Sequence, residues 1–144
     1  MKLSKIFSLL MLLAVMIMQS NAVLAETVVI VHPSNALANL SKSEIKRLFL
    51  VKRDTFPDGS KATPVDQTNN TDFRNAFYKS ITNKNESQMK AYWSKMIFSG
   101  KASPPEVLDN DAAVKAWVAS NPSGIGYIES SQVDETVKVV FTVH

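Results

Sequence analysis

The chain contains no cysteine among its 144 residues. This absence excludes a disulfide framework, a thiol nucleophile and any metal site that depends on cysteine ligands. It also excludes a lipid anchor attached to an N-terminal cysteine. The folded chain must therefore be stabilised by its packed core.

Histidine and glycine are also scarce, with two histidines and four glycines in the whole chain. His32 precedes a proline, where a polar residue at the end of a strand is the simplest interpretation, and His144 is the last residue. Neither a Gly-x-Ser-x-Gly nucleophile motif nor a phosphate-binding P-loop occurs in the sequence. The sequence therefore argues against an enzyme, and neither a cofactor nor a metal ion is expected.

The N-terminus has the pattern of a secretory signal peptide. Lys2 and Lys5 precede an apolar run over residues 6–18, and small residues follow up to Ala25. We expect residues 1–25 to be a signal peptide and Glu26 to begin the mature, periplasmic protein. Cleavage after Ala22 and retention of an uncleaved anchor helix are the alternatives.

The charge balance gives little reason to expect a nucleic-acid partner. The formal net charge of the whole chain is +3. Lys2 and Lys5 leave with the signal segment, and the net charge of residues 26–144 is therefore about +1. No block of lysine and arginine remains to neutralise a phosphate backbone. The length and apolar content of residues 26–144 predict one globular domain.

Strands and helices alternate in the predicted order of elements. β-branched or alternating apolar residues predict strands over 27–31, 62–66, 125–128 and 136–143. The last of these is expected to direct one set of side chains to one face: Val137, Val139, Phe141 and Val143. A turn is expected at Phe56–Gly59. The alternation predicts an α/β layer structure.

Four helices are predicted from their caps and their apolar spacing. Ser41 with Glu44 and Asn85 with Gln88 have the spacing of capping boxes, and Thr71 can cap a third helix. A fourth helix begins near Asp109–Asp111. The expected core-facing residues are Ile45, Leu48 and Phe49; Phe73, Ala76, Phe77 and Ile81; Met89, Tyr92, Trp93, Met96 and Ile97; and Val114, Trp117 and Val118.

The segment between the second strand and its helix is the best candidate for a binding site. A helix N-terminus offers unpaired N–H groups and a partial positive charge, which suit an oxyanion. The candidate ligand-binding residues are Thr68, Asn69, Asn70, Thr71 and Arg74. The alternative is an ordinary polar loop with a capping residue and a solvated Arg74, and nearby Asp66 and Asp72 would repel an anion.

The remaining aromatic and basic clusters are expected to be structural. Trp93 and Trp117 lie on the apolar faces of their helices and should be buried, although a ligand-stacking surface is the alternative. The lysines at 79, 84 and 90 are expected to form a solvated face.

Two motifs and the loop between them resemble phosphate-type periplasmic substrate-binding proteins of ABC transporters. The motifs are LSKSEIKRLFL (residues 40–50) and ASNPSGIGYI (residues 119–128). The resemblance implies the fold of one lobe of a type II periplasmic binding protein, which in this family closes on an anion together with a second lobe. Thr71 matches a hydroxyl donor of the family's Ser-Gly-Thr anion loop, whereas Asn69 and Asn70 replace its serine and glycine.

The sequence is therefore compatible with two functions. The first is non-enzymatic binding of phosphate or a similar small oxyanion, with an inner-membrane ABC permease or another periplasmic protein as partner. The second is a periplasmic interaction or structural module that keeps the lobe and binds no ligand.

Overall fold

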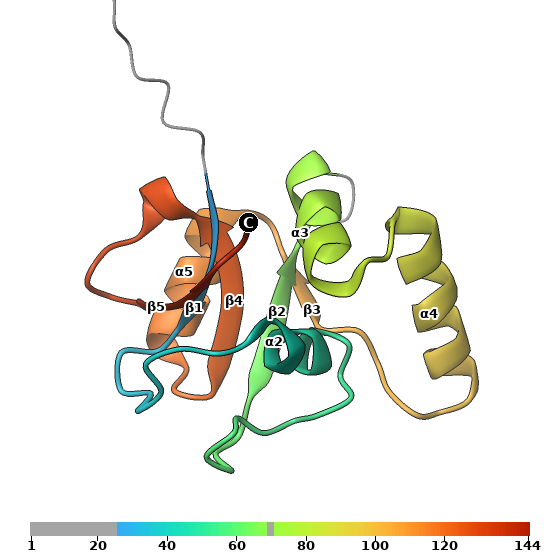
Figure 1. The fold of residues 1–144 in the computed structure, drawn as a ribbon, viewed down its shortest axis with the longest axis horizontal. Coiled ribbons are helices and arrows are strands. Elements are labelled where there is room, and N and C mark those ends of the chain that lie inside the picture. The colour runs from blue at the N-terminus through green and yellow to red at the C-terminus, as the bar shows by residue number, and fades with distance from the viewer. Residues whose placement is uncertain (1–25, 69–70) are drawn as a thin grey trace, which may run out of the picture.

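The computed structural model describes residues 26–68 and 71–144, which form one five-stranded sheet with helices on both faces (Figure 1). The strand order is β3-β2-β4-β1-β5. The strands are β1 (Thr27–Val31), β2 (Thr63–Gln67), β3 (Glu106–Leu108), β4 (Gly124–Glu129) and β5 (Lys138–Thr142). The expected signal segment, residues 1–25, lies outside the described residues.

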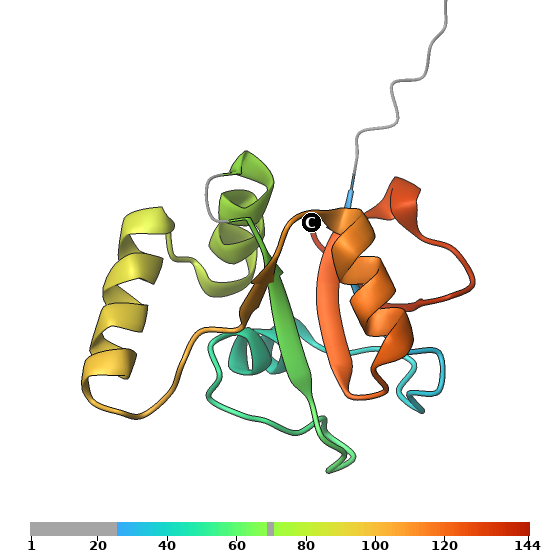
Figure 2. The same cartoon turned by 180° about the vertical axis from the view of Figure 1, so that it is seen from behind.

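The sheet is mixed. β2 runs parallel to both β3 and β4, whereas β1 runs antiparallel to both β4 and β5. Helices α2 (Lys42–Phe49), α3 (Asp72–Thr82) and α4 (Glu86–Phe98) lie on one side, and α5 (Asp111–Ser120) covers the other (Figures 1 and 2). A short 3₁₀ turn, Ser130–Gln132, follows β4. The predicted α/β layer structure is confirmed, and it has three layers.

The core consists of two clusters separated by the sheet. Strand β1 contributes to both, since Val29 and Val31 belong to the cluster under α2, α3 and α4, and Val28 and Ile30 belong to the cluster under α5. These four side chains are buried, which agrees with the continuous apolar run in the sequence.

The predicted helix caps are present. Ser41 Oγ accepts the N–H of Glu44 at 3.2 Å, and the Glu44 carboxylate accepts the N–H of Ser41 at 2.7 Å. Asn85 and Gln88 form the equivalent pair at the start of α4. Two further caps, Thr71 and Asn110, begin α3 and α5. Four local motifs therefore set where the helices begin.

The predicted alternation in the last strand is wrong. The register shifts between Val29 and Ile30 of β1, so that Phe141 packs against one cluster and Val139 against the other. Val140, expected on the opposite face to Phe141, is buried in the same cluster as Phe141. Such a bulge places side chains from two successive positions on one face.

Some helix faces also differ from the prediction. Ala76 is exposed, and α3 buries Arg74 and Tyr78 instead. Trp93 is buried as expected, at 7% exposure, but Trp117 is only half-buried against the α5 cluster. Ile97 was expected to face the core and is 56% exposed, because the last turn of α4 extends beyond the rest of the domain (Figure 1). The short edge strand β3 was not predicted.

Candidate functional site

The candidate site lies at the edge of the sheet where the parallel strands end. β2, β3 and β4 have their carboxyl ends on this edge, and α3 and α5 begin there. In open α/β sheets, ligands bind outside the carboxyl ends of the strands, where helix N-termini converge. The structure therefore places the predicted segment at the expected kind of position.

Thr71 caps α3, as predicted. Its hydroxyl accepts the N–H of Arg74 at 3.2 Å and donates to the carbonyl of Thr68 at 3.4 Å. The N–H groups of Asp72 and Phe73 precede the capped one in the first turn, where helix geometry gives them no intrahelical acceptor. Asn69 and Asn70, two of the predicted ligand-binding residues, lie outside the described residues.

Polar side chains next to Thr71 have partners within the chain. Thr68 donates its hydroxyl to the carbonyl of Asp109 at 2.7 Å. The Gln67 amide donates to the Asp111 carboxylate at 2.6 Å and to the carbonyl of Tyr127 at 2.7 Å. These bonds join the ends of β2 and β4 to the start of α5. They also reduce the number of donors that remain for a ligand.

Arg74 forms a buried ion pair with Asp66, the residue before the end of β2. Arg74 Nε lies 3.0 Å and Nη2 2.9 Å from Asp66 Oδ2, and the two residues are 8% and 2% exposed. Burial acts to lower the pKa of Arg74, but the Asp66 charge outweighs it and the pKa is raised. The guanidinium is thus neither solvated nor free, which the sequence analysis did not anticipate.

Two tyrosines complete the surroundings of Asp66. The hydroxyl of Tyr127 donates to Asp66 Oδ1 at 2.6 Å, and that of Tyr78 donates to Oδ2 at 2.9 Å. Burial first, and then the Asp66 charge, raise the pKa of both tyrosines, so both remain proton donors. Asp66 Oδ1 also accepts the N–H of Gln67 at 2.7 Å. We call Asp66, Arg74, Tyr78 and Tyr127 the buried carboxylate network.

Sequence reasoning did not identify this network, although one signal was available. Arg74 and Tyr78 are four residues apart and share a helix face with Phe77 and Ile81, which are buried. A cation on an apolar face requires a buried anion, and Asp66 follows the apolar Val65 in the predicted strand.

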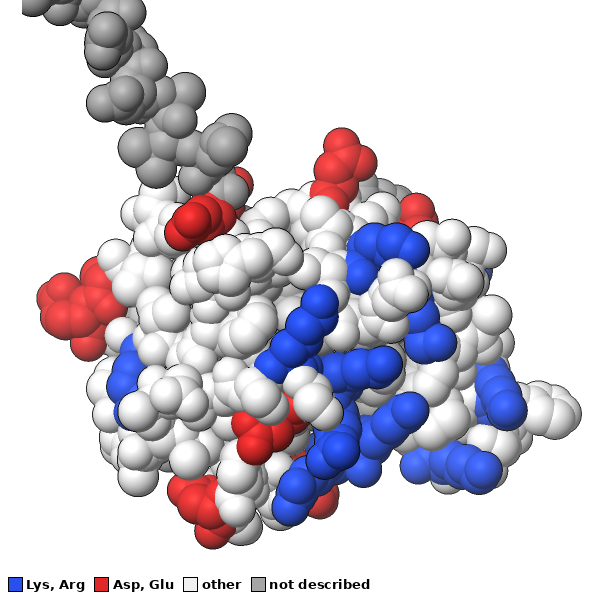
Figure 3. Space-filling model, viewed as in Figure 1, with Lys and Arg blue, Asp and Glu red and all other residues white. Residues whose placement is uncertain are grey.

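The charges around the site are mainly acidic. Asp72 is exposed in the first turn of α3, and Asp109 and Asp111 flank the start of α5. Asp111 also accepts the N–H of Glu129 at 3.0 Å. Red atoms occur along the upper side of the molecule in the view that shows this edge at the top (Figure 3). An anion at the start of α3 would meet an attractive helix terminus and repulsive carboxylates together.

Two absences hold for residues 26–68 and 71–144, the ranges that the structure describes. No group of three or more histidine, cysteine, aspartate or glutamate side chains in these ranges is arranged to hold a metal ion. Within the same ranges, no helix is both long enough and apolar enough to cross a membrane.

The sequence matches no protein-family model and no curated protein. The structure, in contrast, is similar to solved structures. One is a Clostridium perfringens protein, described as a phosphate ABC transporter substrate-binding protein and solved with bound phosphate; its TM-score is 0.65 at 22% identity, and the match covers 81% of this chain and 44% of that one. Another is an ABC-type phosphate transport receptor of Vibrio cholerae, with a TM-score of 0.64 at 15% identity and coverage of 81% of this chain and 45% of that one. A third is PstS of Borrelia burgdorferi, with a TM-score of 0.61 at 11% identity and coverage of 81% of this chain and 46% of that one.

The chain has the fold of one lobe of these proteins. It spans less than half the length of each of the three. The similarity therefore confirms the fold implied by the sequence motifs. At such identities it defines the fold alone, and the ligand has to be argued from the residues of this chain.

Proposed function

We propose that this chain is an exported, non-enzymatic solute-binding protein that binds a small oxyanion, phosphate in the first instance, at the start of α3. The observation that carries the proposal is the position of this helix start, at the carboxyl end of β2, in a fold shared with phosphate-binding proteins. An inner-membrane ABC permease is the corresponding macromolecular partner.

In this proposal the anion contacts backbone N–H groups between Thr68 and Thr71, together with Asn69 and Asn70. The hydroxyls of Thr68 and Thr71 join them by giving up the carbonyls of Asp109 and Thr68 as acceptors. Arg74 contributes in a different way from that expected, because its guanidinium is already paired with Asp66. It cancels the charge of Asp66 and fixes the first turn of α3 against β2. Removal of Arg74 would therefore weaken binding through position and charge balance.

The affinity should be modest. One lobe leaves the helix start open to water, and the nearby carboxylates of Asp72, Asp109 and Asp111 oppose an anion. We expect a Kd no tighter than about 1 μM, which corresponds to about −8 kcal/mol.

The second candidate is an interaction module without a ligand. The observation in its favour is that Thr68, Thr71, Gln67 and Arg74 all have partners within the chain. The two functions are distinguished by a titration of the purified protein with phosphate, followed by amide chemical shifts.

The variant that tests the site best is Asp72→Asn. Asp72 is exposed, and loss of one charge about 6 Å from a bound anion should tighten phosphate binding about threefold in water. Asp58→Asn is the matched control, because Asp58 is also exposed but lies in the turn before β2, at the opposite end of that strand. Equal effects of the two variants would point to net charge instead of this site. If millimolar phosphate shifts no amide between Thr68 and Arg74, binding at this site is refuted and the interaction module is favoured.

Export is part of the proposal and has its own test. The mass of protein recovered from the periplasm should correspond to a chain that begins at or near Glu26. Recovery of a periplasmic chain that retains Met1 would contradict cleavage, and recovery of the chain from the cytoplasm alone would contradict export.

A further inference from the structure

A second surface, on the side of the domain that carries α2 and α4, is rich in lysines and arginines that form no ion pair. Among the described residues, the lysines and arginines in ion pairs are Lys61, Arg74 and Lys115. Most of the others lie on α2, on the loop after it, and from the end of α3 to just beyond α4. They are Lys42, Lys46, Arg47, Lys52, Arg53, Lys79, Lys84, Lys90, Lys95 and Lys101, which we call the basic face.

The basic face lies on one side of the domain, and acidic side chains interrupt it near α2 and the loop that follows (Figure 3). Figure 3 shows blue atoms gathered over α2 and towards the lower end of α4. Lys42 and Lys46 of α2 line a hollow together with Ser80 and Asn83 at the end of α3, which joins the two segments in space. Acidic residues on these helices are few, and Glu44 and Glu86 both lie in first turns.

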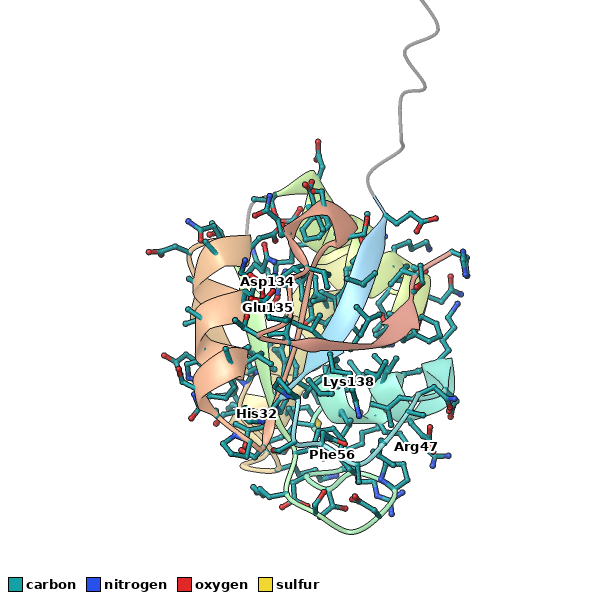
Figure 4. All side chains as sticks on the ribbon, turned by 90° about the vertical axis from the view of Figure 1, so that its left-hand side faces the viewer. His32, Arg47, Phe56, Asp134, Glu135 and Lys138 are labelled. Carbon is teal, nitrogen blue, oxygen red and sulfur yellow. The ribbon has the colours of Figure 1, made fainter. Side chains whose placement is uncertain are left out.

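The acidic residues are concentrated elsewhere. Between residues 106 and 135 there are six acidic side chains, and Lys115 is the only basic one. Arg47 and the pair Asp134 and Glu135 lie on different sides of the domain in Figure 4. The molecule therefore has a charge dipole that its small net charge conceals, and the basic face can attract an anionic partner.

An apolar tip adjoins the basic face at the end of α4. Phe98 is 97% exposed and Ile97 is 56% exposed, the two most exposed large apolar side chains among the described residues. Lys95 precedes them by one turn, and Lys101 follows after Gly100, which ends the helix with a φ of +67°. Two adjacent apolar side chains thus project between cations.

The chemistry of this surface fits anionic lipid better than a protein partner. All the cations of the basic face except Arg47 and Arg53 are lysines, which are depleted in protein–protein interfaces where arginine is enriched. Lysine is a compact charge suited to diffuse attraction by lipid phosphates. Aromatic and aliphatic side chains beside such lysines insert at the boundary between headgroups and acyl chains.

We propose that the basic face docks on an anionic phospholipid bilayer, with Phe98 and Ile97 inserted between the headgroups. This interaction is independent of oxyanion binding at the carboxyl edge, because the two surfaces share none of the proposed ligand-binding residues.

The test measures binding of the exported protein to vesicles of phosphatidylglycerol and phosphatidylcholine in a 3:7 ratio, with pure phosphatidylcholine as reference. We expect binding only to the anionic vesicles and a steep decrease between low and high salt. Phe98→Ser should weaken binding about tenfold, the lower end of the range for burial of a phenylalanine. Val107→Ser, at another exposed apolar side chain, is the matched control and should have no effect.

Charge variants separate the basic face from net charge. The double variant Lys42→Gln with Lys95→Gln should weaken vesicle binding at least tenfold, because each lysine near an anionic membrane surface contributes about 1 kcal/mol of attraction. Lys61→Gln with Lys115→Gln removes the same charge from cations that already have carboxylate partners, and should have much less effect. The proposal is overturned by equal binding to both kinds of vesicle, by equal effects of the two double variants, or by capture of an acidic protein without vesicle binding.

Discussion

Replacement of Arg74 by methionine tests whether the buried carboxylate network stabilises the fold. Arg74→Met keeps much of the side-chain volume but leaves the Asp66 carboxylate buried without its cation. Removal of one partner from a buried pair costs about 3–5 kcal/mol. The hydroxyls of Tyr78 and Tyr127 would still donate to Asp66, so we expect the lower half of this range.

The double variant Asp66→Asn with Arg74→Met should recover part of this loss. Neither residue is charged in the double variant, and the asparagine carbonyl can still accept a tyrosine hydroxyl. The free energies of unfolding from urea denaturation should therefore be non-additive, with a coupling of about 2 kcal/mol. The exposed pair Lys61 and Asp54, 3.1 Å apart, is the control. The two single variants and the double variant of that pair should show little coupling between their free energies of unfolding.

Simply additive effects of Asp66→Asn and Arg74→Met would refute a stabilising interaction between the two charges. Additivity would mean that the two charges are solvated in solution despite their burial in the structure. An unchanged urea dependence of unfolding in each variant is needed for the comparison, because a change would indicate a different extent of unfolding.

Three further predictions concern the core and the tyrosines. Trp93→Ala should destabilise the protein by about 3–5 kcal/mol, and ready quenching of Trp93 fluorescence by iodide would contradict its burial. Gly126→Ala should cost about 1–3 kcal/mol in thermal or urea unfolding, since a Cβ there would lie 2.5 Å from Val114 Cγ1; an unchanged midpoint would contradict this packing. The pKa of Tyr78 and of Tyr127 is raised in the folded state, so their contribution to stability is complete below about pH 10 and is lost as pH rises above it. Absorbance at 295 nm should show that these two ionise only as the protein unfolds, and reversible ionisation near pH 10 would refute this.

The local parts of the fold could be predicted because their signals lie within a few residues of each other. The Ser41–Glu44 box spans four residues, and the structure shows both of its hydrogen bonds. The buried β1 strand could likewise be read from its continuous β-branched run. Such features depend on neighbouring positions and little on the rest of the chain.

The buried carboxylate network could not be predicted in the same way. Asp66 and Tyr127 are 61 positions apart, and their contact requires β2 and β4 to be neighbours in the sheet. The sequence indicated a polar strand-to-helix segment, but it did not show which of its donors would be used internally. The bulge in β5 also depends on the pairing of distant strands, and it disrupted the predicted alternation there.

The internal position of β1, between β4 and β5, has a consequence for the order of folding. β1 is the first strand along the chain, yet its neighbours in the sheet are β4 and β5, which end at Glu129 and Thr142. Its backbone can therefore be paired only after nearly all of the chain has been synthesised. Contacts so distant in sequence slow folding, and the nascent chain remains unfolded for longer. A chain that ended before Lys138 would keep β1 as an unprotected edge strand of apolar residues, which favours aggregation.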